Sequence, residues 1–311
     1  MPRASSMVLV SLIASTLTAC ECGGDGTESV EIASCSTHDP ALEEPRTIGA
    51  ATLTPDDRRL VITGLPETSR WVVGRGAALS IEPFLPTLDA IEALEPHGVI
   101  VLGSFGTGER LEELVTALGE LTVGGAPVPI LLVPGPRDHL ASLDEALAAH
   151  PQPHVISLAG THVVEIGRVA LLVASGSVEA RYVLEGACHV EDLDEVLGAS
   201  DPEHVRVVLG FDAPAGSPLT RGVDGAEAGS ERMRAALEEA GIVAGIFAGP
   251  DTQVGRWVAG DAAVLGVGLD RRVIVAPLAG PAVDCADGSR APSGPTLVAL
   301  GPSGLGPVES R

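Results

Sequence analysis

Six side chains that could do chemistry follow short apolar runs of the kind that form buried strands. In chain order they are Ser104, Arg137, Asp138, His139, Asp212 and Asp251. Loops at the ends of strands are where α/β folds place their ligands, so we expect these side chains to gather at one edge of the fold.

Arg137 stands in the turn-forming stretch Gly135-Pro136-Arg137-Asp138. Its planar guanidinium could hold an anion through two parallel hydrogen bonds. The alternative is an ion pair between Arg137 and a nearby carboxylate, either Asp138 or Asp212. Both interpretations stay open at the level of sequence.

A second hypothesis concerns a cation. Carboxylate oxygens and imidazole nitrogens are ligands for divalent ions, and a single ion such as Ca²⁺ needs several of them within a few ångströms. The candidates are Asp138, His139, Asp212 and Asp251. If these four side chains converge, the sequence predicts one cation site.

The composition excludes several other chemistries. The 311-residue chain carries 42 acidic and 19 basic residues, for a net charge of −23, and every basic residue is Arg because the sequence contains no Lys. Nucleic-acid binding needs clustered positive charge, so no nucleic-acid partner is expected. Without Lys there is no Schiff-base chemistry and no Walker-type phosphate loop.

The N-terminus has the pattern of an export signal that ends in a lipid anchor. Arg3 precedes an apolar stretch of thirteen residues, Met7–Ala19, which is too short to span a bilayer but suits a secretory signal. The closing tetrapeptide Leu17-Thr18-Ala19-Cys20 resembles the lipobox of bacterial lipoproteins, in which the Cys thiol carries diacylglycerol. We therefore predict residues 1–19 as a lipoprotein signal peptide and Cys20 as the lipidated residue, with an ordinary signal peptide as the alternative. Acyl chains would anchor the protein in the bacterial cell envelope, at its periplasmic or outer-membrane face.

Four more cysteines remain, and export would place them where disulfides form. They are Cys22, Cys35, Cys188 and Cys285. Their wide, irregular spacing lacks the paired Cys-x-x-Cys ligands of zinc sites, so structural disulfides are expected. Four thiols allow three pairings, and Cys22 could also stay unpaired, so the pairing remains open.

The residue pattern predicts one α/β domain behind a flexible tether. Residues 20–45 are rich in Gly, Ser, Thr, Glu and Pro and form the predicted tether, and residues 46–311 form the domain. Predicted strands lie at 71–73, 98–102, 128–133, 154–158, 161–166, 168–174, 204–209, 243–247, 263–267, 272–276 and 296–300. Predicted helices lie at 86–94, 108–121, 140–149, 190–197 and 230–240. The strands between residues 154 and 174 have no helix between them, which favours a meander.

From roughly residue 70 to residue 260, this order of elements resembles the calcineurin-like metallophosphoesterases. The stretch Gly98–His139 carries the resemblance best. Its strand ending in Gly103, its amphipathic helix and its strand leading into Gly135-Pro136-Arg137-Asp138 parallel the family's Gly-Asp and Gly-Asn-His-Asp blocks. Ser230–Gly249 is similar to the helix and strand before the family's Gly-His-x-His block. The resemblance implies an α/β fold with two mixed β-sheets sandwiched between helices and with metal ligands at the strand ends.

The ligand positions that the resemblance implies carry other residues here. They are Gly74, Gly76, Ser104, Pro136, Phe211, Pro250 and Thr252. Arg137 replaces the His that protonates the leaving group, and Asp138 is kept. Gly, Pro and Phe side chains cannot coordinate a cation, and without two metals no water is activated. We therefore expect no metal and no other cofactor.

The resulting expectation is an exported, lipid-anchored pseudoenzyme of phosphoesterase fold. It would act by binding a partner or a ligand at the cell envelope, with the membrane held through lipidated Cys20 and an envelope protein as a possible partner. The alternative is a divergent metal-dependent phosphoesterase that hydrolyses a phosphate ester with Mn²⁺ or another divalent metal.

Overall fold

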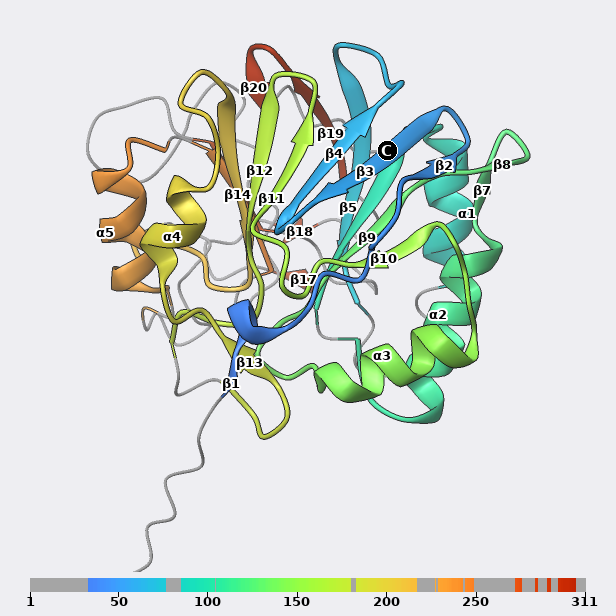
Figure 1. The fold of residues 1–311 in the computed structure, drawn as a ribbon, viewed down its shortest axis with the longest axis horizontal. Coiled ribbons are helices and arrows are strands. Elements are labelled where there is room, and N and C mark those ends of the chain that lie inside the picture. The colour runs from blue at the N-terminus through green and yellow to red at the C-terminus, as the bar shows by residue number, and fades with distance from the viewer. Residues whose placement is uncertain are drawn as a thin grey trace, which may run out of the picture. The chain divides into compact units, whose positions relative to one another are not determined.

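The described helices and strands of the computed structural model all lie in residues 32–311 (Figure 1). The structure describes residues 33–76, 85–103, 105–179, 183–216, 227, 229–242, 244–248, 272–275, 283–284, 290–291 and 296–305. These residues belong to one compact unit that spans residues 32–311. The predicted signal peptide, Cys20, Cys22, Cys285 and the predicted strand at 263–267 lie outside the described residues.

The first large sheet has six strands in the order β10-β9-β6-β5-β19-β20. Their bounds are Val155–Ser157 for β10, Ile130–Val133 for β9, Gly98–Leu102 for β6, Ser69–Arg75 for β5, Thr296–Gly301 for β19 and Gly304–Leu305 for β20. The four strands from β10 to β5 run parallel, and β19 pairs antiparallel with β5. The carboxyl ends of the four parallel strands therefore meet at one edge of the sheet.

The second large sheet has eight strands in the order β16-β15-β14-β12-β11-β4-β3-β2. Their bounds are Arg272–Val275 for β16, Ala244–Phe247 for β15, Val205–Gly210 for β14, Val169–Ala174 for β12, Val163–Ile166 for β11, Arg59–Thr63 for β4, Ala51–Asp56 for β3 and Arg46–Ile48 for β2. Strands β12, β14, β15 and β16 run parallel, whereas β11 and β12 form an antiparallel hairpin.

Three pairs of short strands complete the described elements. β1 (Ala33–Ser34) pairs in parallel with β13 (Cys188–His189), and a 3₁₀ helix, η1 (Cys35–Thr37), follows β1. The pairs β7 (Thr122–Val123) with β8 (Ala126–Pro127) and β17 (Val283–Asp284) with β18 (Arg290–Ala291) are antiparallel.

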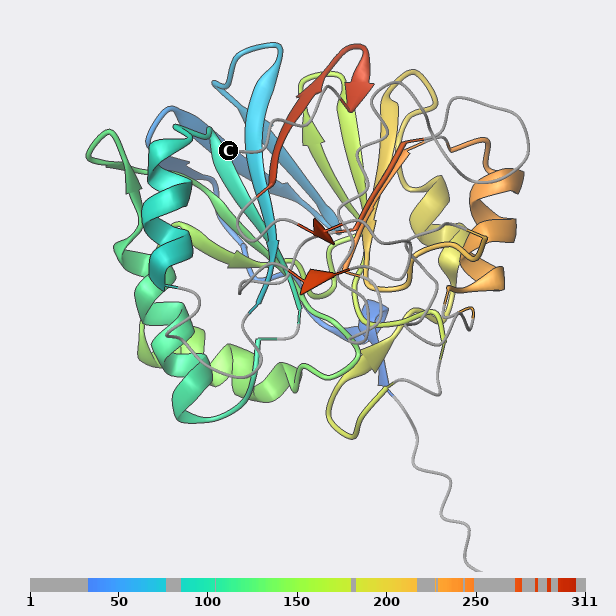
Figure 2. The ribbon, with the colours of Figure 1, turned by 180° about the vertical axis from the view of Figure 1, so that it is seen from behind.

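Helices cover the outer face of each sheet, as the opposite views in Figures 1 and 2 show. The helices are α1 (Leu85–Ala93), α2 (Glu109–Glu120), α3 (Leu140–Ala149), α4 (Leu193–Gly198) and α5 (Glu231–Glu239). Apolar residues of α2 and α3 cluster with those of β6 and β9, and apolar residues of α4 and α5 cluster with those of β12 and β14. The layers are therefore helix, sheet, sheet, helix.

The core between the two sheets follows from the two-residue period of strands, because successive side chains point to opposite faces. In β6, Ile100 and Leu102 join the core between the sheets, while Val99 and Val101 join the core under the helices. Strands that lie under the helices are covered on both faces, which explains why β6, β9 and β12 are continuous apolar runs. Strands β2, β3 and β4 keep exposed or half-buried residues. The predicted α/β fold of two mixed sheets sandwiched between helices is confirmed.

Many predicted elements are confirmed with small shifts in their bounds, and β6 and α3 occur at the predicted residues. The predicted meander is half wrong. Strands β11 and β12 pair as a hairpin around Gly167, but β10 joins the other sheet beside β9. Sequence proximity favours pairing, but β10 pairs in parallel with β9 because α3 crosses between them.

The prediction of a tether over residues 20–45 is wrong for residues 33–45. Ala33 and Ser34 pair with the strand β13, Cys35 is buried in a disulfide with Cys188, and Leu42 lies in the core between the sheets. The polar composition of this segment suggested disorder, yet one disulfide and one buried Leu fix it to the domain.

The helices that the structure describes include none that is long and apolar enough to cross a membrane.

Candidate functional site

The loops that follow the parallel strands form one edge of the molecule, which we call the strand-end edge. It comprises Arg75, Gly103 and the segments 134–139, 175–179 and 211–213, which follow β5, β6, β9, β12 and β14. Backbone hydrogen bonds join neighbouring loops: Gly103 N–H donates to Val133 O over 2.8 Å, and Gly176 N–H donates to Pro134 O over 2.7 Å. The second of these bonds connects the two sheets at this edge.

Asp138 joins two of these loops through its carboxylate. It is 2% exposed, Oδ1 accepts a hydrogen bond from Phe105 N–H at 2.6 Å, and Oδ2 accepts one from Gly135 N–H at 2.8 Å. A buried backbone N–H without a partner is costly, so the carboxylate stabilises both loops. The side chain that the family resemblance keeps therefore has a structural role in this chain.

Gly103 leaves the space that the Asp138 carboxylate fills. A Cβ added at Gly103 would lie 2.0 Å from Asp138 Oδ2 and 2.4 Å from the backbone nitrogen of Gly135. No side chain can occupy that volume while Asp138 keeps its hydrogen bonds. The glycine and the aspartate thus form one packing unit at the ends of β6 and β9.

Asp212 plays a similar part between β14 and β12. Its Oδ2 accepts hydrogen bonds from Ser177 Oγ at 2.5 Å and from Val178 N–H at 2.6 Å, and the residue is 7% exposed. Burial raises the pKa of Asp212 above its ordinary value, and the bonds from Ser177 and from the backbone of Val178 and Glu179 oppose that shift. The nearby charge of Glu179 adds to the rise in the Asp212 pKa.

Arg75 brings a positive charge to the same edge. It ends β5, is 2% exposed, and places its guanidinium carbon 6.0 Å from the centre of the Phe211 ring, within the range of a cation–π contact. The Phe211 ring also lies against Gly135, because a Cβ on that glycine would be 3.3 Å from Phe211 Cδ2. Arg75 was not among the residues predicted from the sequence, although a charged residue at the end of an apolar strand was a signal for it.

Arg137 and His139 lie at the exposed rim of the edge. The Arg137 side chain is exposed, and its role as an anion fork stays a prediction. His139 is the N-cap of α3: its Nδ1 accepts a hydrogen bond from Ser142 N–H at 3.2 Å. Its ring packs so closely on Gly186 that a Cβ there would lie 1.9 Å from His139 Cδ2. His139 therefore caps a helix and is not oriented as part of an ion site.

The predicted cation site is not assembled by the candidates that the structure describes. Asp138 and Asp212 accept hydrogen bonds from neighbouring loops, His139 caps α3, and Asp251 lies outside the described residues. Within the described ranges there is no group of three or more His, Cys, Asp or Glu side chains that could hold a metal ion. The hypothesis of one cation held by these four side chains is unsupported in the described part.

The family resemblance implies a dinuclear metal centre, which needs side-chain oxygen or nitrogen donors at its ligand positions. Gly74, Gly76, Pro136 and Phe211 occupy four of its ligand positions and offer no side-chain donor, and a Cβ on Gly74 would meet no described atom within 4 Å. Ser104, Pro250 and Thr252 lie outside the described residues. The described positions therefore do not fit a pair of cations.

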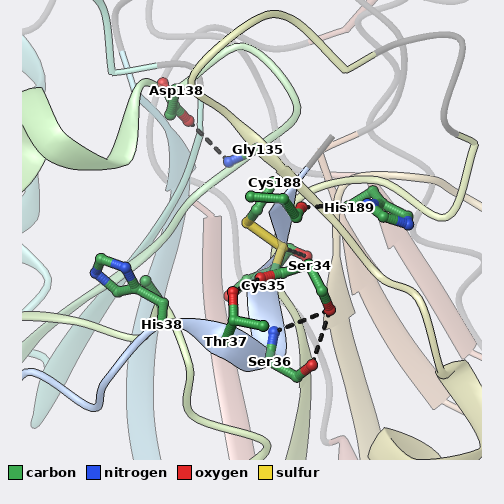
Figure 3. The surroundings of a disulfide bond; sticks show 12 residues. Ser34, Cys35, Ser36, Thr37, His38, Gly135, Asp138, Cys188 and His189 are labelled. Atoms are coloured by element: carbon green, nitrogen blue, oxygen red, sulfur yellow. Dashed lines mark hydrogen bonds between the residues drawn. A yellow bond between two sulfur atoms is a disulfide. The ribbon is translucent and has the colours of Figure 1, made fainter. Parts of the chain in front are cut away.

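A disulfide lies directly beneath the strand-end edge. Cys35 is bonded to Cys188, and the structure therefore selects one pairing among the cysteines that the sequence left open (Figure 3). The cystine is buried, with Cys188 fully inaccessible, and it packs with Leu140 and Ala159. Cys35 Sγ lies 2.9 Å from the carbonyl oxygen of Ser175, the residue that follows β12.

A small surface pocket opens beside the cystine. Its water-accessible volume is only about 20 Å³, and its lining includes Ser34, Ser36, Thr161, His162, Ser175 and Glu195. His162 Nδ1 lies 3.6 Å from Glu195 Oε1, and burial lowers the pKa of His162 below its ordinary value. The pocket is too small for an organic ligand, since ligand pockets usually exceed about 300 Å³.

No protein-family model matches the sequence, and no curated protein matches it significantly. Two solved structures are similar in fold. One is 14% identical, has a TM-score of 0.49, and covers 78% of this chain and 99% of that chain. The other is the crystal structure of TT1561 of Thermus thermophilus, which is 12% identical, has a TM-score of 0.47, and covers 77% of this chain and 99% of that chain. At identities this low, a shared fold says nothing of activity.

Proposed function

We propose that this chain is an exported, lipid-anchored binding protein with a calcineurin-like phosphoesterase type of fold and without the phosphoesterase reaction. The observation that carries the proposal is that four ligand positions implied by the family resemblance, Gly74, Gly76, Pro136 and Phe211, offer no side-chain donor. Asp138, which the resemblance keeps, here accepts hydrogen bonds from Phe105 N–H and Gly135 N–H and holds two loops together. Binding is then the function that the edge can still perform.

The charges of the edge support a role in binding. Buried Arg75 sits against the Phe211 ring, and exposed Arg137 stands at the rim between Pro136 and Asp138. Of these two groups Arg137 is the exposed one, and its charge has the sign that attracts an acidic or anionic partner. Leu184, which is 55% exposed, adds apolar surface beside Pro136, whose carbonyl accepts a hydrogen bond from Leu184 N–H.

Site-specific photo-crosslinking in the cell envelope tests this proposal. The photoreactive amino acid p-benzoylphenylalanine replaces Arg137 at the strand-end edge or, as a matched control, Arg168 in the turn between β11 and β12. Both arginines are exposed, and they lie at opposite ends of the parallel strands. We expect a discrete adduct from position 137 and none from position 168. Equal adducts, or none at either position, would contradict a binding role for this edge.

The enzymatic alternative predicts a different result. A divergent phosphoesterase would hydrolyse an aryl phosphate when Mn²⁺ is added, and a chelator would abolish the turnover. We expect no metal-dependent turnover above that of buffer. Substitution of Asp138 is a poor control for this assay, because loss of its two hydrogen bonds would disturb the loops whatever the reaction. Turnover that needs Mn²⁺ and that survives further purification would favour the enzyme.

A further inference from the structure

The Cys35–Cys188 disulfide connects the N-terminal segment to the loops of the strand-end edge. Besides the disulfide, residues 33–38 are held by the two-residue strand β1, by the contact of His189 Nδ1 with Ala33 O at 3.1 Å, and by His38, whose Nε2 lies 3.1 Å from Asp144 Oδ2. The Ala33↔Cys188 and Ser34↔His189 pairs place this segment beside β13, and His189 in turn bridges to Ser177 of the edge. The disulfide is therefore the covalent part of the connection between the N-terminal segment and the loops of the edge.

The loop after β12 passes in direct contact with the cystine. Gly176 has a φ of +81°, and a Cβ there would lie 2.2 Å from Cys188 O and 2.7 Å from Cys35 Sγ. Such a left-handed backbone and so close an approach both require glycine. The loop after β12 therefore packs directly on Cys35 Sγ and on the backbone of Cys188.

Three backbone hydrogen bonds carry this constraint to the rim of the edge. Gly176 N–H donates to Pro134 O over 2.7 Å, Leu184 N–H donates to Pro136 O over 2.8 Å, and Leu140 N–H donates to Gly186 O over 3.0 Å. All three join residues of 176–179 or 183–190 to the segment 134–140, which contains Arg137 and Asp138. Figure 3 shows Gly135 and Asp138 above the cystine.

We propose that the Cys35–Cys188 disulfide is an oxidation-dependent switch that orders the strand-end edge only after the chain reaches an oxidising compartment. This inference deepens the proposed function and rests on it for its purpose, because it concerns regulation of the same edge. In the reduced chain, residues 33–38 loosen from β13, and residues 134–140, 176–179 and 183–190 lose the support of the cystine. The partner-binding edge then stays disordered until export.

The chemical step is thiol–disulfide exchange with an oxidised dithiol of the exported compartment. The two Cys thiols lose two protons and two electrons as the S–S bond forms, and the disulfide of the oxidant gains them and becomes two thiols. Such oxidants act in the periplasm and not in the cytoplasm. The bond joins two cysteines that are 153 residues apart in the sequence.

Hydrogen exchange with mass spectrometry tests the switch without any ligand, so its outcome is independent of what the edge binds. The variant is Cys35→Ala with Cys188→Ala, since Ser at the fully buried position 188 would bury an unpaired hydroxyl. The reporters are the amides of Leu140, Gly176 and Leu184. We expect each to exchange about tenfold faster in the variant, while the amides of β6 and β14 keep their protection.

The wild-type protein treated with a dithiol reductant gives a second measurement in which no side chain is replaced. We expect the same three amides to lose protection, and the same reductant to change nothing further at them in the double variant. Faster exchange confined to residues 33–38 would overturn the proposal, because the disulfide would then hold only its own segment. Uniformly faster exchange of the described strands in both samples would also overturn it, since the bond would then support the whole fold.

Discussion

Single side chains at the strand-end edge hold backbone groups that would otherwise lack partners. Asp138 illustrates this most clearly, because each of its oxygens accepts a hydrogen bond from a different loop. Asp138 and Asp212 were candidate remnants of a reaction centre, but in the structure they stabilise loops. We therefore expect their substitution to lower the stability of the fold before it changes any activity.

We expect Asp138→Ala to lower the free energy of unfolding by about 3 kcal/mol, because two buried N–H groups lose their acceptor. Asp138→Asn keeps one acceptor oxygen and should lose roughly half as much. Urea denaturation followed by circular dichroism measures both. Asp194→Ala on the exposed face of α4 is the control and should change stability by less than about 0.5 kcal/mol. Equal stability of Asp138→Ala and wild type would refute the structural role.

The raised pKa of Asp212 predicts a pH dependence with a definite sign. Burial makes the folded protein hold the Asp212 proton more tightly than the unfolded chain does, for which the ordinary value is 3.8. The stabilisation that Asp212 contributes is therefore fully present below pH 3.8 and is lost as the pH rises through the pKa of Asp212 in the folded protein. Asp212→Asn should flatten the dependence of the urea midpoint on pH above 3.8. An unchanged profile in the variant would mean that another group titrates.

Buried histidines should act in the opposite direction. Burial lowers the pKa of His154 and of His162 below 6.5, so the folded protein binds the proton less readily than the unfolded chain. The stabilisation that these two histidines contribute is fully present above pH 6.5. It is lost as the pH falls from that value towards their pKa in the folded protein. His154→Gln and His162→Gln should each weaken the loss of stability on acidification in the same urea titrations. Variants that lose stability on acidification as steeply as wild type would exclude these histidines as its cause.

At the scale of elements, the strand ends differ in how closely the next loop packs on them. At the end of β6, a Cβ on Gly103 would overlap Asp138 and Gly135, whereas near the end of β5 a Cβ on Gly74 would meet no described atom within 4 Å. The two glycines look alike in sequence, since each follows a run of apolar residues. Their environments separate only when the loops are in place.

This contrast gives a matched pair of substitutions. Gly103→Ala should destabilise the protein by about 3 kcal/mol, because overpacking forces the loop or the Asp138 carboxylate to move. Gly74→Ala should be neutral or stabilise by up to about 1 kcal/mol, since glycine is unfavourable inside a strand. Thermal unfolding of both variants and of wild type measures the change in stability that each substitution causes. A larger loss for Gly74→Ala than for Gly103→Ala would contradict the packing described here.

At the scale of the molecule, the two sheets are tied together at one edge by a short series of contacts. The hydrogen bond from Gly176 N–H to Pro134 O joins the loops of the two sheets, and the cystine packs against Gly176. The same edge receives the N-terminal segment through β1 and β13. The part of the chain that enters the fold from the predicted anchor is thus bonded to the loops proposed to bind a partner.

Much of this molecule follows from its sequence. Apolar runs bounded by glycine and proline predict most strands of both sheets but not β2, β3 and β4, and the spacing of Leu111, Leu114 and Leu118 predicts the buried face of α2. These periodicities are local, so the sequence alone shows them. Ser230 as the cap of α5 is equally local, because the side chain bonds an amide three residues ahead.

Tertiary structure alone decided the rest, because it depends on contacts between residues far apart in the chain. Nothing near Cys35 indicates that it meets Cys188 or that residues 33–45 join the domain. Nothing near Asp138 shows that its oxygens are taken by Phe105 and Gly135 and are not open to a cation. Residue types show which chemistry is possible. Long-range packing selects the partners of each polar atom, and these partners determine which of the possible reactions or binding roles the residue can still perform.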